Sequence, residues 1–140
     1  MKIKDIYQNK KAVFSFEIFP PNENFSSEKL YEVINELSTQ NPDFISVTYG
    51  AGGTTRGGTI EIASYIKNKL NIETVTHLTC VGSRKSEIES FLDELESNNI
   101  ENILALRGDI PKDQDESIYD SGDFLYASDL VKAVRATNRF

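Results

Sequence analysis

The sequence contains few of the residues that form disulfides and metal centres. Among its 140 residues there is a single cysteine, Cys80, so no disulfide can form within the chain, and this favours a reducing cytoplasm. There is also a single histidine, His77. One histidine and one cysteine are too few ligands to complete a zinc site, and Cys80 is most simply a small apolar residue that fills a core.

Basic residues and long apolar runs are also scarce. Lysine and arginine total 15 against 22 aspartate and glutamate residues, giving a net charge of −7, which argues against nucleic acid or an anionic membrane as a partner. No apolar run approaches the roughly 20 residues that span a bilayer, and Met1–Asp5 lacks the apolar segment of a secretory signal. We therefore expect a cytoplasmic, single-domain protein with a sizeable core.

What the sequence does contain is a steady alternation of strand and helix patterns. Strand candidates begin near residues 12, 44, 74 and 102, at intervals of 32, 30 and 28 residues. Short connections in such an alternation predict a parallel sheet with right-handed crossovers. The expected strands are 12–17, 44–48, 73–78 and 102–106; the expected helices begin at a cap at Ser26 or Ser27, near Thr59, at a capping box in Ser86–Glu89, and around Ala127.

The predicted fold class is α/β, with parallel (β/α) units of a TIM barrel, about four of the eight. A complete barrel typically takes about 250 residues. Val131–Arg135 resembles the middle of a helix, and Phe140 closes the chain without a helix stop signal. We therefore expect a half-barrel from a truncated chain. Its two unpaired strand edges and uncovered inner face predict self-association, hence a homo-oligomer, or poor solubility.

Chemically capable residues gather where the predicted strands end, and in a parallel sheet these ends share one rim. Glu17 lies among Phe14, Phe16, Ile18 and Phe19. An apolar pocket there would raise the pKa of its carboxyl and make it a proton donor near neutral pH. The alternative is a strand-end carboxylate that pairs with a lysine.

Three further segments allow two interpretations each. Gly50–Thr55 suits close approach of a ligand, although it lacks the P-loop lysine and the third glycine of a dinucleotide fingerprint, and it could equally be a tight connection. His77 is a structural histidine or a site residue. Arg107-Gly108-Asp109 is a site at the rim or an intrachain ion pair. The acidic stretch Asp109–Asp123 is a solvated loop or a substrate lid.

Taken together, five segments resemble the methylenetetrahydrofolate reductase family, and their order and spacing make the resemblance specific. They are Ser15–Pro21, Phe44–Arg56, His77–Cys80, Asn102–Pro111 and Tyr126–Val131. The resemblance implies an eight-stranded α/β barrel, of which residues 1–140 are the N-terminal part. It also implies FAD at the carboxyl ends of the strands, NAD(P)H as reductant, and conversion of methylenetetrahydrofolate to methyltetrahydrofolate, which feeds methionine synthesis.

The resemblance also assigns roles to particular positions. Glu17 matches the general acid of the family, and Asp109 matches an aspartate that tunes the flavin and contacts the folate. The flavin-contacting positions are matched by Thr48, Tyr49, Ala51, His77, Arg107, Gly108, Asp109, Tyr126 and Ala127. Two alternatives stay open: a non-catalytic fragment of such an enzyme that is unable to hold flavin, and an unrelated nucleotide-binding α/β module that uses the glycine-rich segment.

Overall fold

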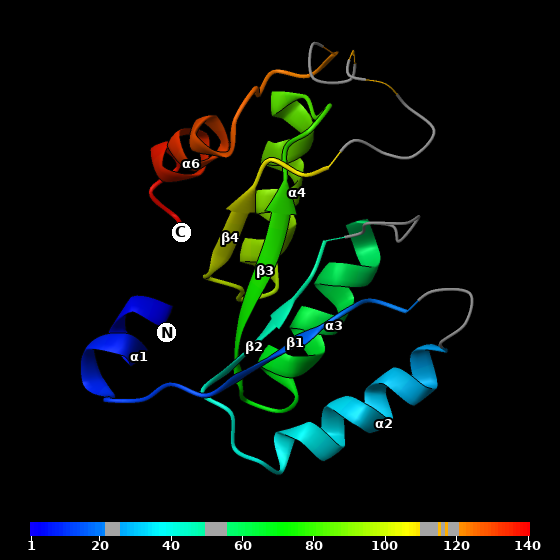
Figure 1. Cartoon of the computed structure of the whole chain (residues 1–140), viewed down its shortest axis with the longest axis vertical. Coiled ribbons are helices and arrows are strands. Elements are labelled where there is room, and N and C mark those ends of the chain that lie inside the picture. The colour runs from blue at the N-terminus through cyan, green and yellow to red at the C-terminus, as the bar shows by residue number, and fades with distance from the viewer. Residues whose placement is uncertain (22–25, 50–55, 110–114, 116, 118–120) are drawn as a thin grey trace.

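The computed structural model describes residues 1–21, 26–49, 56–109, 115, 117 and 121–140. The described part alternates strands with helices along the chain (Figure 1). In order the elements are α1 (Ile3–Asn9), β1 (Ser15–Ile18), α2 (Ser27–Ser38), β2 (Phe44–Val47), α3 (Arg56–Asn68), β3 (Glu73–Thr79), α4 (Lys85–Ser97), β4 (Ile103–Leu106) and α6 (Ala127–Ala136).

The four strands form one sheet in the order β1-β2-β3-β4, and every neighbouring pair is parallel. The predicted fold class of parallel α/β units in sequential order is therefore confirmed. The register sets Glu17 of β1 against Ser46 of β2, and Ser46 against Val75 of β3. Because neighbouring strands run the same way, their carboxyl ends meet at one rim, as the sequence predicted.

The core lies between one face of this sheet and the helices that cover it. Side chains alternate between the two faces of a strand; in β2, Ile45 and Val47 are fully buried, whereas Phe44 and Ser46 are only partly covered. Helices α2, α3 and α4 pack on the buried face and contribute Ile34, Ile66 and Leu95, which are also fully buried. The opposite face, here called the inner face, stays open, and Leu104 on β4 is 44% exposed.

Each described helix from α2 onward is followed by an asparagine in the left-handed conformation. Asn41, Asn71, Asn99 and Asn138 have φ values of 53°, 56°, 61° and 56°. Asparagine tolerates this conformation better than other residues with a side chain, so it reverses the chain after the helix. The expectation that the last helix has no stop signal was wrong, because α6 ends at Ala136 and Asn138 supplies the signal.

Three local expectations also need correction. The helix α1 carries too short an apolar pattern to be recognised in the sequence, and the first strand starts at Ser15 rather than at residue 12. The capping box at Ser86–Glu89 was wrong, because the cap of α4 is Arg84. The backbone N–H of Arg84 donates to the Glu87 carboxylate at 2.7 Å, so Ser86 lies inside the first turn.

We predict that Leu95→Ala lowers the free energy of unfolding by about 2–5 kcal/mol, because it leaves a cavity where α4 meets the sheet. Leu125→Ala is the matched control: Leu125 is 53% exposed, and its truncation should cost under about 0.5 kcal/mol. Urea denaturation measures both values. Equal losses in the two variants would contradict this account of the core.

Candidate functional site

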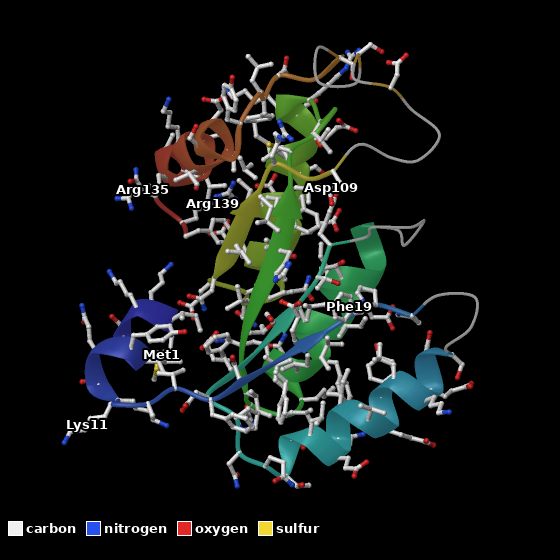
Figure 2. All side chains as sticks on the ribbon, viewed as in Figure 1. Met1, Lys11, Phe19, Asp109, Arg135 and Arg139 are labelled. Atoms are coloured by element: carbon white, nitrogen blue, oxygen red, sulfur yellow. The ribbon has the colours of Figure 1, made fainter. Side chains whose placement is uncertain are left out.

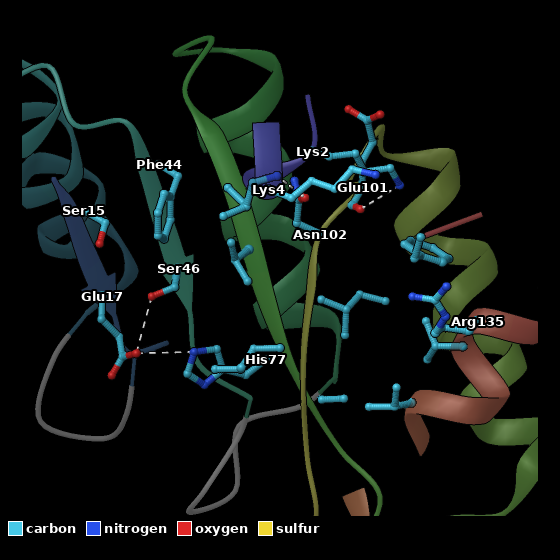
Figure 3. A pocket seen from close by; sticks show the side chains of 18 residues that line it. Lys2, Lys4, Ser15, Glu17, Phe44, Ser46, His77, Glu101, Asn102 and Arg135 are labelled. Atoms are coloured by element: carbon cyan, nitrogen blue, oxygen red, sulfur yellow. Dashed lines mark hydrogen bonds and ion pairs between the residues drawn. The ribbon is translucent and has the colours of Figure 1, made fainter. Parts of the chain in front are cut away.

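A cavity of about 690 Å³ lies on the inner face of the sheet, between the strands, the N-terminal segment and α6 (Figure 3). Its wall is partly apolar, with Phe44, Val75 and Leu104 from three successive strands. Of the predicted site residues, Glu17 and His77 line it. The structure therefore brings together two residues that are 60 positions apart in the sequence.

Glu17 and His77 are in direct contact. The Glu17 Oε2 atom lies 3.3 Å from His77 Nε2, an ion-pair distance. The Ser46 hydroxyl on the intervening strand lies 3.4 Å from the same carboxylate oxygen and also 3.4 Å from the Phe16 carbonyl oxygen. Ser46 was missed in the sequence; the signal that could have found it is the strand register, which sets it directly beside Glu17.

The described residues do not form the apolar pocket expected around Glu17. The side chain of Glu17 is 48% exposed, because strand alternation directs Ile18 to the opposite face, where it is buried in the core. Phe14 and Phe19 lie outside the strand and are 49% and 66% exposed. Within the part of the chain that the structure describes, the ion-pair partner of Glu17 is a histidine rather than the lysine of the alternative expectation.

His77 is the buried member of the pair, with 8% of the residue exposed. Burial lowers the pKa of its imidazole, and the neighbouring Glu17 carboxylate opposes that effect. Its Nε2 atom makes no well-aligned hydrogen bond with any described residue. A buried ring nitrogen without such a bond is costly to maintain, and the Glu17 carboxylate is the charged group in contact with it.

The remaining predicted residues lie at the rim. Thr48 and Tyr49 follow β2, and Arg107, Gly108 and Asp109 follow β4; Asp109 lies next to the tip of β3 (Figure 2). The Arg107 carbonyl accepts hydrogen bonds from the backbone N–H groups of Cys80 and Val81 at 3.1 and 2.7 Å. This binds the segment after β4 to the segment after β3, so both chain segments contribute to one edge.

The two aromatic residues predicted at the rim, Tyr49 and Tyr126, differ in their surroundings. The Tyr49 ring packs edge-on against Phe91 of α4, with the ring centroids 5.4 Å apart, and Tyr49 is only partly buried. Tyr126 precedes α6 and is 62% exposed. Its carbonyl oxygen lies 3.8 Å from Cys80 Sγ, which holds Tyr126 and Ala127 beside the end of β3.

Ala51, the rest of Gly50–Thr55 and most of the acidic stretch after Asp109 lie outside the described residues.

Gly108 has a structural role that the sequence only suggested. Its φ of 92° is rarely adopted by residues with a side chain, and an added Cβ would lie 2.8 Å from Val81 Cγ1 and 3.0 Å from Thr79 Cβ. The chain can thus turn from Arg107 to Asp109 only because this position carries no side chain.

The fold and the site define a class: parallel α/β proteins built from sequential βα units, with functional groups at the inner face and carboxyl rim of the sheet. The sequence profile described as methylenetetrahydrofolate reductase matches residues 2–140. The chain belongs to this family.

Relatives in plants and bacteria agree. The chain is 42% identical over 135 residues to methylenetetrahydrofolate reductase (NADH) 1 of Arabidopsis thaliana, covering 96% of this chain and 23% of that protein. It is 36% identical over 126 residues to 5,10-methylenetetrahydrofolate reductase of Escherichia coli, covering 90% of this chain and 40% of that protein. The chain thus spans about a quarter to two fifths of the length of these relatives. None of the helices in the described residues is long and apolar enough to cross a membrane.

We predict that Gly108→Ala destabilises the protein by about 1–3 kcal/mol, because alanine is strained at this φ and its Cβ meets Val81. The cost should be smaller in a Val81→Ala background, which removes the nearest contacting atom. Urea denaturation of the two single variants and the double variant gives this comparison. If Gly108→Ala cost the same in both backgrounds, contact with Val81 would have no part in the effect.

Proposed function

We propose that the protein containing these residues reduces methylenetetrahydrofolate to methyltetrahydrofolate with NAD(P)H and FAD, in the cytoplasm. We propose further that residues 1–140 are the N-terminal part of its barrel. The observation that supports this most directly is the family match across residues 2–140 together with a carboxylic acid, Glu17, on the inner face of the sheet. The homo-oligomer expected from the open sheet edges stays a prediction.

The residues on the inner face and rim fit a flavin. A flavin ring is flat and largely apolar and has polar edges; the cavity offers the apolar side chains of Phe44 and Val75 and the polar side chains of Glu17 and Ser46. His77, the main chain of Thr48 and Tyr49, and Arg107 would hold the cofactor. When bound, FAD supplies the hydride carrier between the nicotinamide nucleotide and the folate.

The part that this chain plays in the chemistry is the handling of a proton. Reduction of methylenetetrahydrofolate requires its five-membered imidazolidine ring to open, and the departing nitrogen must be protonated. Glu17 has the carboxyl group for this, and its side chain is exposed enough to reach a substrate in the cavity. Hydride transfer from a nicotinamide nucleotide needs no protein acid, so the two half-reactions differ in their need for Glu17.

The alternative function is that of a non-catalytic fragment, and the short span of the chain relative to its relatives is what favours it. Bound flavin absorbs visible light, so a spectrum of the purified 140-residue chain separates a flavin-holding protein from such a fragment.

In a protein that carries the complete barrel, we predict that Glu17→Gln slows folate reduction by about 10²–10⁴-fold. Flavin binding and flavin reduction by the nicotinamide nucleotide should stay unchanged, because glutamine keeps the shape and loses only the acidic proton. Stopped-flow absorbance of the flavin follows both half-reactions separately. The control is Glu36→Gln on the exposed surface of α2. Equal slowing of both half-reactions would make Glu17 a structural residue.

We also predict that Asp109→Asn raises the reduction potential of the flavin, by about 30 mV or more for a change near 1.4 kcal/mol. A carboxylate beside the flavin disfavours the negative charge gained on reduction, and asparagine removes that effect. Folate should also bind more weakly. Asp115→Asn, which removes the same charge from the same acidic stretch, is the control for the potential. An unchanged potential together with unchanged folate affinity would exclude Asp109 from the site.

A further inference from the structure

Glu17 and His77 meet although they belong to β1 and β3, which do not pair with each other. Their side chains reach across β2, where Ser46 lies between them (Figure 3). One carboxylate oxygen, Glu17 Oε2, is within 3.3 Å of His77 Nε2 and 3.4 Å of Ser46 Oγ. The histidine is buried at 8% exposure, whereas the glutamate side chain is 48% exposed. His77 is therefore the buried member of the pair, and Glu17 is the member that faces the cavity.

Two groups in this arrangement can hold one proton in two ways. A protonated carboxyl can donate to Nε2, or a protonated imidazole can donate to the carboxylate, and the pair is electrically neutral in both cases. The proton then leaves the pair as a unit rather than either residue alone.

We propose that Glu17 and His77 share one proton on the inner face of the sheet, that Glu17 delivers it to the substrate, and that Ser46 holds the carboxylate for this exchange. The identity of the substrate rests on the proposed function. In the transfer, the bond between the proton and the pair breaks and an N–H bond forms on the departing nitrogen. The pair is left as a carboxylate and a neutral imidazole, and it regains its proton from solvent. In this mechanism His77 and Ser46 are positioning residues.

The proposal accounts for a discrepancy between the sequence expectation and the structure. No apolar pocket surrounds Glu17 among the residues that the structure describes, and the buried group beside it is His77. Burial lowers the pKa of the imidazole, and the carboxylate of Glu17 opposes this. In this proposal, contact with His77 keeps a proton on the pair at the cavity, whereas the sequence suggested that burial of Glu17 would do so.

Other charged groups around the cavity lie away from the pair. Figure 3 shows Lys2, Lys4 and Glu101 at the opposite end of the cavity and Arg135 on α6, on its far side. Glu73, earlier on β3, is bound to Lys67 at 2.7 Å and to the terminal amine at 2.7 Å. Arg107 and Asp109 belong to the rim after β4. Among the described residues, Glu17 is accordingly the charged group that raises the pKa of His77, against the larger lowering by burial.

His77 is the single histidine of the chain, so its titration can be followed directly by NMR with ¹³C-labelled histidine in the 140-residue protein. We expect Glu17→Gln to lower the apparent pKa of His77 by about one unit, because the carboxylate that favours the imidazolium is removed. Ser46→Ala should lower it by less, since the carboxylate is then held less firmly. Glu36→Gln, the matched control on α2, should leave it unchanged. If the His77 titration were unchanged in Glu17→Gln, the shared proton would be overturned. If it were unchanged in Ser46→Ala, Ser46 would have no part in holding the carboxylate.

A second measurement uses a protein with the complete barrel and follows the pH dependence of folate reduction. The rate should fall as pH rises through the apparent pKa of the pair. In His77→Gln this fall should move to lower pH by about one unit or more, with the rate recovering in acid, because a lone carboxyl loses its proton earlier. A fall at the same pH as in the unmodified protein would overturn the proposal.

The two experiments distinguish a failure of the shared proton from a failure of the proposed function. If Glu17→Gln shifts the His77 titration but leaves folate reduction unchanged, the shared proton stands and the proposed acid in the reaction is wrong. If folate reduction collapses while the titration does not move, the proposed function stands and the pair is overturned. Because the titration needs neither flavin nor folate, it also decides the case if His77→Gln does not retain flavin.

Discussion

The structure depends first on the parallel hydrogen bonding of four strands in sequential order. This pairing fixes which residues stand beside one another, because the register sets Glu17 against Ser46 and Ser46 against Val75, which lies two residues before His77 on β3. It also gathers the chain segments after β2, β3 and β4 at one edge. The helices contribute the buried layer that holds the sheet in this form, and the site is a consequence of strand pairing rather than of any single local motif.

Much of the fold could be predicted because its signals are local and repeated. Apolar periodicity predicted the helices α2, α3, α4 and α6, the spacing of the strands predicted their parallel pairing, and the Ser26 cap lies where the sequence indicates. The helix α1 was missed because its seven residues include one buried side chain, Ile6, and so little apolar face to detect. The stop signal at Asn138 was missed because an asparagine in the left-handed conformation is not distinguished by sequence from any other surface asparagine.

The candidate site was predicted only in part, for a different physical reason. Sequence neighbours suggested that Glu17 is surrounded by apolar side chains, but adjacent residues of a strand face opposite sides of the sheet. Contacts across the sheet decide the environment of Glu17, and these depend on register, which no local pattern reveals. The same holds for Ser46, whose importance follows from its position between β1 and β3 and from nothing in its own sequence surroundings.

The alternation of faces along β1 has a consequence for how this protein can change over evolutionary time. Deleting or inserting one residue inside β1 would exchange the two faces, sending Glu17 under the helices and Ile18 into the cavity. Both the core and the acid would be lost in one event. Length variation among descendants is therefore confined to connections between elements, and the strand interiors can drift in side-chain identity but not in residue number.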